Sequence, residues 1–187
     1  MREAEVKRFQ KTILDWHKKY GRHSLPWRKT YDPYKILVSE LMLQQTQVLR
    51  VIPKYKSFLR KFPTARALAK ASVLSILKEW QGLGYNRRAL FLKRTADAVV
   101  KKYKGVFPKN VSELESLPGI GVYTARAISV FAWNKPEVFI ETNIRRIFIH
   151  FFFSNVRKKI SDSDIMPYVE ASLLKKNPRL WYSALMD

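Results

Sequence analysis

The chain has 187 residues, 47% of them hydrophobic, which is enough for one domain or two small lobes with a real core. Its 36 Lys and Arg residues against 15 Asp and Glu give a formal charge of +21, which favours a polyanionic partner and predicts salt-sensitive binding. The absence of cysteine excludes disulfides and thiolate metal sites, and three dispersed histidines argue against a histidine metal site. No apolar run is long enough to span a bilayer and the first residues do not resemble a signal peptide, so a basic membrane-surface protein is the remaining membrane alternative.

The spacing of apolar residues and of capping residues predicts helices throughout, and no segment alternates with a period of two. The expected helices cover residues 3–20, 32–51, 55–62, a short segment from 63, 73–80, 86–103, 112–117, 122–133, 141–152, 161–176 and 177–187. The fold class is therefore predicted to be all-α.

Three local expectations concern the first half of the chain. The first helix should bury a stripe made of Val6, Phe9, Ile13 and Trp16. Asp32 should cap the second helix, with Pro33 at its first position, because proline is preorganised there. Pro53 should break or restart that helix, since proline removes a hydrogen bond from a helix interior.

The stretch LPGIGVYTARAI, from Leu117 to Ile128, is typical of the turn and second helix of a helix–hairpin–helix. Ser112 and Glu115 have capping-box spacing, so a short helix should begin at Ser112. Gly119 and Gly121 permit positive φ and close backbone approach, while Ile120 between them can fill the core. The backbone N–H groups at the start of the next helix then form an anion-binding site.

This hairpin motif occurs together with LPWR (25–28), SELMLQQTQV (39–48) and GLGY (82–85). In this order and spacing the motifs resemble the helix–hairpin–helix (HhH-GPD) DNA glycosylase superfamily, and the chain looks most like its MutY adenine glycosylases, over roughly residues 9–187. The resemblance implies a two-lobed fold with the active site in the cleft between the lobes. Residues 22–133 would form a central lobe containing the hairpin, and residues 1–21 plus 134–187 the second lobe.

Glu40 lies on or beside the apolar stripe of its helix, where a carboxylate is costly unless it is paired or protonated. Burial raises the pKa of a carboxylic acid, which suits a proton donor near neutral pH. An ion pair with Lys35 or Arg146 is the structural alternative. The resemblance implies that Glu40 is the catalytic glutamate, which protonates a ring nitrogen of adenine.

Breaking an N-glycosidic bond builds positive charge on the sugar, which a second carboxylate can stabilise. The family has an aspartate for this at the start of a helix, and the matching stretch FIETNIRRI has Glu141, one methylene longer. A plain helix cap interacting with the helix dipole is the alternative role of Glu141.

Tyr123 stands where the strand-cutting branch of the family has a Schiff-base lysine, so the resemblance implies a monofunctional glycosylase. Tyr123 could hydrogen-bond the catalytic carboxylate or line the base pocket, and it is also the residue of thymine-mismatch glycosylases. A core tyrosine is the structural alternative.

An enzyme that acts on a base must flip it out of the duplex and fill the gap. Gln44 and Gln45 resemble the family's probe of the opposite strand, and Tyr85 resembles its wedge between bases. Trp27 and Arg28 resemble residues lining the adenine pocket. The structural alternatives are a loop anchor for Tyr85 and a core tryptophan beside an exposed arginine for the LPWR pair.

DNA contact is expected from Gly119, Gly121 and Val122, through backbone amides, and from Arg126. The basic helix after GLGY offers further candidate phosphate contacts, or simply a solvated face: Arg87, Arg88, Lys93, Arg94, Lys101 and Lys102. If about six phosphates are neutralised, log K should fall with log salt with a slope of about −5.

The expected partner is double-stranded DNA with a mispaired or damaged base, bound by a monomer, and the expected location is the cytoplasm, at the nucleoid in a bacterium. No redox cofactor is needed. The family's iron–sulfur cysteines and C-terminal recognition domain are absent, which fits either a cluster-free lineage or a truncated chain, and the family's hairpin carbonyls leave room for a monovalent cation. The alternative functions are excision of thymine or uracil opposite guanine, and DNA binding without catalysis.

Overall fold

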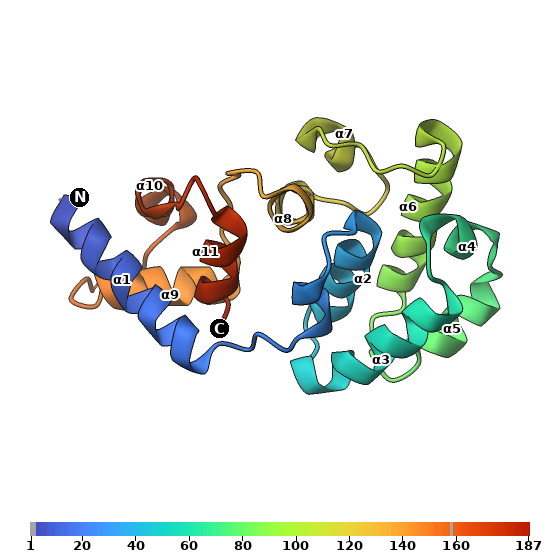
Figure 1. Ribbon diagram of the computed structural model, residues 1–187, viewed down its shortest axis with the longest axis horizontal. Coiled ribbons are helices and arrows are strands. Elements are labelled where there is room, and N and C mark those ends of the chain that lie inside the picture. Colours follow the sequence, from blue (N-terminus) through green and yellow to red (C-terminus); the bar gives the residue numbers. More distant parts are fainter. Residues whose placement is uncertain (1–2, 158) are drawn as a thin grey trace. The chain divides into compact units, whose positions relative to one another are not determined.

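The computed structural model describes residues 3–157 and 159–187, which contain helices and no strand (Figure 1). The helices are α1 (Glu3–Tyr20), η1 (Pro26–Lys29, a 3₁₀ turn), α2 (Pro33–Leu43), α3 (Val48–Lys61), α4 (Ala65–Lys70), α5 (Val73–Trp80), α6 (Arg87–Tyr103), α7 (Val111–Glu115), α8 (Val122–Trp133), α9 (Thr142–Phe152), α10 (Asp162–Ser172) and α11 (Pro178–Leu185). The all-α prediction is confirmed for the described residues. Among them, no helix combines the length and apolar character that crossing a bilayer requires.

The chain divides into two compact units, Ser24–Trp133 and Met1–His23 with Asn134–Asp187. The first, here called the hairpin unit, holds η1 and α2 to α8, and the second, the terminal unit, holds α1 and α9 to α11. Segments from the two ends of the chain therefore share one unit, while the middle of the chain forms the other.

Helix α2 is the central element of the hairpin unit and packs against α3, α6 and α8. Its side chains are buried on nearly every side, with Leu37 and Val38 fully inaccessible. A helix that is apolar all round belongs in a core, so any polar side chain on α2 is unusual for its surroundings. Asp32 caps α2 as predicted, its carboxylate accepting the N–H of Tyr34 at 2.9 Å.

Helix α2 ends eight residues earlier than the sequence predicted, at Leu43 rather than Val51. Gln45 adopts a left-handed backbone with φ 53°, which an α-helix cannot contain. A new helix, α3, then starts at Val48 and runs through Pro53, so the predicted break at Pro53 is wrong. Gln44 to Gln47 therefore form a loop and not a helical face.

The terminal unit is built around Phe9 of α1, whose ring makes edge contacts with Phe148, Phe152 and Trp181 at centroid distances of 5.0 to 5.6 Å. Phe9 and Ile13 are buried as predicted. Trp16 is 45% exposed, which corrects the predicted stripe, and His17 is buried in its place. The His17 ring lies 2.8 Å from the Asp187 carboxylate, which also accepts from the Arg22 side chain at 2.7 Å.

Candidate functional site

The hairpin is formed by α7, the turn after it and α8. Asn110 caps α7 by accepting the N–H of Ser112 at 2.9 Å, so the predicted cap at Ser112 is wrong by two residues. Asparagine competes well for this position because its short side chain reaches the free amides of the first turn.

The turn itself follows the predicted logic at two of its three residues. Ile120 is 5% exposed and plugs the core, and Gly119 has φ 81°. A Cβ on Gly119 would lie 2.5 Å from the Phe91 side chain. Gly121 has neither a left-handed φ nor a close neighbour, which corrects that expectation. Thr95 of α6 donates to the Pro118 carbonyl at 2.6 Å and fastens the turn to the unit.

Gly121 and Val122 are exposed at the start of α8, with Val122 at 54%. The amides of a first helical turn have no intrahelical acceptors, and the helix dipole makes this end positive. Arg126, one turn further along α8, is half-buried. The start of α8 is therefore exposed where the sequence predicted an anion-binding site, and that site stays a prediction.

Glu40 and Tyr123 meet inside the hairpin unit. Glu40 projects from α2 and Tyr123 from the first turn of α8, and the Tyr123 hydroxyl donates to Glu40 Oε2 at 2.9 Å. Both side chains are half-buried. Of the roles that the sequence left open for Tyr123, the hydrogen bond to this carboxylate is therefore present. Lys35, an alternative ion-pair partner for Glu40, lies 4.0 Å from Asp32 instead.

Glu141 belongs to the terminal unit and is the N-cap of α9. Its Oε1 accepts the N–H of Ile144 at 2.8 Å, with an extended backbone of φ −126° and ψ 177°. Glutamate is not among the preferred N-cap residues, whose side chains are shorter. Glu141 thus acts as a helix cap, which was the alternative role predicted for it. One oxygen of its carboxylate makes the capping hydrogen bond.

The predicted probe and wedge residues lie in two loops of the hairpin unit. Gln44 and Gln45 are exposed in the loop after α2, and Tyr85 is 64% exposed before α6. Tyr85 has φ 47°, like Gln45 a left-handed non-glycine residue. The loop-anchor alternative for Tyr85 predicted a ring buried in the core, whereas the ring is largely in solvent.

Trp27 and Arg28 both lie in η1 and are half-buried. Trp27 packs against the core of the hairpin unit, with its ring in edge contact with Tyr55 at 5.5 Å. Burial raises the pKa of the Tyr55 hydroxyl well above its usual value. Trp27 is therefore in part a core residue, as the structural alternative predicted, and the rest of its side chain is accessible.

Helix α6 is less open to phosphates than its composition predicts. Arg88 is 8% exposed and bonds to backbone carbonyls, so its prediction as a phosphate contact is wrong. Lys93 donates to the Ala69 carbonyl at 2.8 Å and pairs with Asp97. Arg87 and Arg94 remain exposed.

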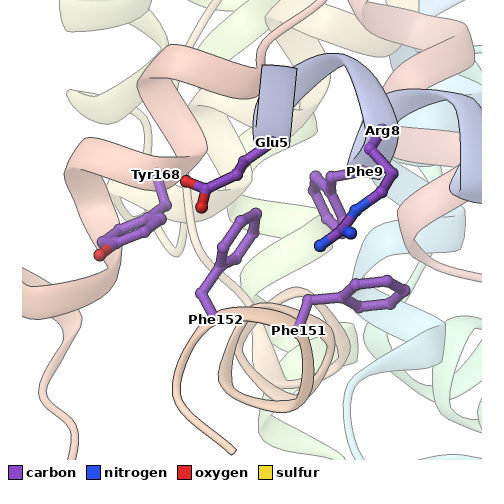
Figure 2. Close-up of a pocket in the computed structure, with 6 residues that line it drawn as sticks. All are labelled: Glu5, Arg8, Phe9, Phe151, Phe152 and Tyr168. Atoms are coloured by element: carbon purple, nitrogen blue, oxygen red, sulfur yellow. The ribbon is translucent and has the colours of Figure 1, made fainter. Parts of the chain in front are cut away.

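A pocket of about 380 Å³ opens in the terminal unit (Figure 2). Its walls come from α1, α9 and α10: Glu5, Arg8, Phe9, Phe151, Phe152 and Tyr168. None of the predicted site residues lines it. Within residues 3–157 and 159–187, no group of three His, Asp or Glu side chains gathers as a metal site would require. The chain also has no cysteine to ligate an iron–sulfur cluster, so the family's cluster does not fit these residues.

Residues 38–169 match the model of the HhH-GPD superfamily of base excision DNA repair proteins, and the chain belongs to that family. It is 38% identical over 179 residues to an adenine DNA glycosylase of Buchnera aphidicola subsp. Baizongia pistaciae, covering 96% of this chain and 51% of that protein. It is 34% identical over 182 residues to a thymine/uracil-DNA glycosylase of Pyrobaculum aerophilum, covering 96% of this chain and 79% of that protein.

Solved structures agree with the family. A thermostable thymine-DNA glycosylase superposes with a TM-score of 0.88 at 29% identity, over 98% of this chain and 85% of that one. An endonuclease III from a DNA complex shares the fold, with a TM-score of 0.75 at 17% identity over 97% and 86% of the two chains. The family and fold predictions are therefore confirmed. The chain spans about half the length of the adenine DNA glycosylase from Buchnera.

Proposed function

We propose that this chain is a monofunctional DNA glycosylase that hydrolyses the N-glycosidic bond of a flipped adenine mispaired with guanine or oxidised guanine. The observation that carries the proposal is the Glu40–Tyr123 hydrogen bond, in which a carboxyl group on a core helix meets the first turn of the hairpin helix. Similarity to adenine DNA glycosylases, at 34% to 43% identity, supports the choice of base.

In the proposed reaction Glu40, in its acid form, donates its proton to a ring nitrogen of adenine. The bond between the sugar carbon and the base nitrogen then breaks, and its electrons leave with the neutral base. Glu141 lowers the energy of the positive charge that develops on the sugar. Water then adds to the cationic sugar carbon and gives up a proton to the carboxylate of Glu40, which returns Glu40 to its acid form and leaves an abasic site. Tyr123 holds Glu40 in place by its hydrogen bond and offers no amine for a Schiff base.

Duplex DNA is the proposed partner, bound by a monomer. The hairpin amides near Gly121 and Val122 take a phosphate, with Arg126 beside them on α8. Gln44 and Gln45 probe the opposite strand and Tyr85 fills the space that the flipped base leaves. Trp27 and Arg28 line the base pocket. Each of these proposed roles can be tested by mutating the residue. The salt dependence of duplex binding should show a slope of about −5 in log K against log salt.

A second candidate substrate is thymine or uracil opposite guanine. Two observations favour it: the relative from Pyrobaculum carries that activity in its name, and a thymine-DNA glycosylase superposes with a TM-score of 0.88. The reaction type would be unchanged, and only the pocket that reads the base would differ.

Single-turnover excision on a duplex panel tests the proposal. The panel holds adenine opposite oxidised guanine, adenine opposite guanine, thymine and uracil opposite guanine, and a matched duplex, each read with and without alkali. Adenine release that requires alkali to cut the strand supports the proposal. Pyrimidine release favours the second candidate, strand cleavage without alkali contradicts the monofunctional assignment, and tight binding without release would leave a DNA-binding protein of this fold.

A further inference from the structure

Arg88 lies at the start of α6, yet its guanidinium points inward and is buried. Between them, its two terminal nitrogens contact the end of α2 and two separate loops. Nη1 donates toward the carbonyl oxygens of Leu41 at 2.7 Å, Met42 at 3.2 Å and Gln44. These carbonyls belong to the last turn of α2 and to the loop of Gln44 to Gln47 that follows it, here called the probe loop.

Nη2 faces mainly the other loop, where it donates to the carbonyl oxygens of Leu83 at 3.0 Å and Gly84 at 3.1 Å. It also donates to Thr46 Oγ1 of the probe loop at 3.2 Å. Leu83 and Gly84 form the wedge loop together with Gly82 and Tyr85. Thr46 in turn lies 3.3 Å from the Leu83 carbonyl, so the two loops are also bridged directly. One planar fork therefore holds both loops at a fixed separation.

Burial lowers the pKa of the Arg88 guanidinium, and the groups around it offset part of this cost. The carbonyls at the C-terminal end of α2 carry the negative end of the helix dipole, which favours a cation. The guanidinium also lies 5.4 Å from the Tyr85 ring centroid and 5.6 Å from that of Trp80. A cation over an aromatic face attracts the ring, so Arg88 contacts both the backbone of the wedge loop and the wedge side chain itself.

Each loop carries a backbone conformation that its residue disfavours. Gln45 has φ 53° in the probe loop, and Tyr85 has φ 47° in the wedge loop. Non-glycine residues keep such angles only where the surroundings hold them. Arg88 bonds to the carbonyl immediately before each of these residues, Gln44 and Gly84. The same side chain thus fixes both strained positions from the residue that precedes them.

We propose that Arg88 is a positioning residue that sets the probe loop and the wedge loop in register, so that Gln45 and Tyr85 enter the duplex together. The proposal rests on the proposed function and concerns its base-flipping step. Arg88 does not touch the reacting atoms. Its loss should impair the opening of a paired duplex and spare the chemistry on a base that is already unpaired.

The test compares Arg88→Met and Arg88→Lys with Arg60→Met, which removes an exposed arginine from α3 in the same unit. Single-turnover excision is measured on a mispaired duplex and on the same sequence with the target base in an unpaired bubble. Misplacement by about 1 Å can cost roughly 100-fold in rate. We expect Arg88→Met to lose about 100-fold on the duplex and less than about 5-fold on the bubble.

Arg88→Lys should lie between the wild type and Arg88→Met, because one ammonium group cannot span both loops as a fork does. Arg60→Met should match the wild type on both substrates. Equal losses on duplex and bubble would show a general structural role and overturn the proposal. Thermal unfolding is followed for every variant. If Arg88→Met does not fold, the role of Arg88 is decided with Arg88→Lys and with Thr46→Val, which removes the bridging hydroxyl. For these variants too, the excision rate on the duplex is compared with the rate on the bubble.

A second readout does not depend on catalysis. 2-Aminopurine placed beside the mispair fluoresces when the stack opens, and the measurement is made with Glu40→Gln and with Glu40→Gln combined with Arg88→Met. A smaller or slower signal in the double variant supports the positioning role, and an unchanged signal overturns it. If the wild type releases no base from any substrate, the proposed function fails, and this signal still decides the role of Arg88.

Discussion

The two carboxylates proposed for catalysis have different kinds of partner. Glu40 in the hairpin unit is bonded by Tyr123, which follows it by 83 residues and lies on another helix. Glu141 in the terminal unit is bonded by the amide of Ile144, three residues along the same segment. A helix needs its cap wherever it occurs, whereas a tyrosine brought to a carboxylate from a distant helix requires the whole fold. The tertiary partner is therefore the better indicator of function.

Glu40→Gln should have the largest effect in this comparison. Gln cannot donate a proton to a leaving base, and general acid catalysis contributes about 100-fold to 10,000-fold. We expect single-turnover excision to fall by about 1,000-fold. Binding to a mispaired duplex should change little, because the amide keeps the size of the side chain and an acceptor for Tyr123.

The matched control is Glu79→Gln, a carboxylate of the same unit whose pKa is lowered by its hydrogen bonds to Lys61 and Ser57. It should leave excision unchanged. A full rate in Glu40→Gln would remove the proposed acid and, with it, the distinction between the two carboxylates.

Glu141 needs variants that separate capping from charge. Ser keeps a good cap but removes the carboxylate, and Asp keeps both, so Glu141→Ser should unfold at or above the wild-type temperature while excising more slowly. A charge interaction of about 2 kcal/mol predicts roughly 30-fold. Glu141→Asp should excise the base at about the wild-type rate.

If Glu141→Ser retains the full rate, the carboxylate is only a cap. Glu141→Ala completes the set, since it should lose both the charge interaction and about 1 kcal/mol of helix stability. Rates and unfolding temperatures measured on the same preparations keep the two effects apart.

The two hairpin glycines show the same contrast within one turn. Gly119 has φ 81°, and a Cβ there would lie 2.5 Å from the Phe91 side chain, whereas a Cβ at Gly121 would meet open space. Gly119→Ala should destabilise the protein by about 2 kcal/mol and weaken duplex binding, because both the backbone angle and the contact with α6 oppose it. Gly121→Ala should stay within about 0.5 kcal/mol. Denaturant unfolding measures both, and equal effects would contradict the structural distinction.

The sequence predicted what depends on local patterns. Helix periodicity, the Asp32 cap and the core position of Ile120 follow from neighbouring residues, and all three are confirmed. The errors arise where distant contacts decide the outcome. Carbonyls at the end of α2 bond to Arg88, more than forty residues away, and nothing in the sequence around Arg88 indicated that this charged residue is buried.

In the candidate site, too, the sequence predicted some features, while others depend on contacts between distant parts of the chain. Resemblance brought Glu40, Tyr123 and the loop residues into one hypothesis, and the hydrogen bond between the first two is present. No sequence pattern distinguished Arg88 from Arg87 beside it, since only the folded chain shows which of them turns inward. One usable sign was the position of Arg88 three residues after the GLGY loop, whose glycines favour a non-helical backbone.

Tyr123→Phe is the smallest and most specific change to the comparison, because it removes only the hydroxyl that gives Glu40 its tertiary partner. A hydrogen bond to a carboxyl group contributes about 1 kcal/mol, so we expect excision to slow by roughly 5-fold to 10-fold with unchanged duplex binding. Combining Tyr123→Phe with Glu40→Gln should add almost nothing to Glu40→Gln alone, since the hydroxyl acts through the carboxyl group. Independent, multiplying losses would mean that Tyr123 contacts the base itself, and Glu40 would then need another explanation for its place on a buried helix.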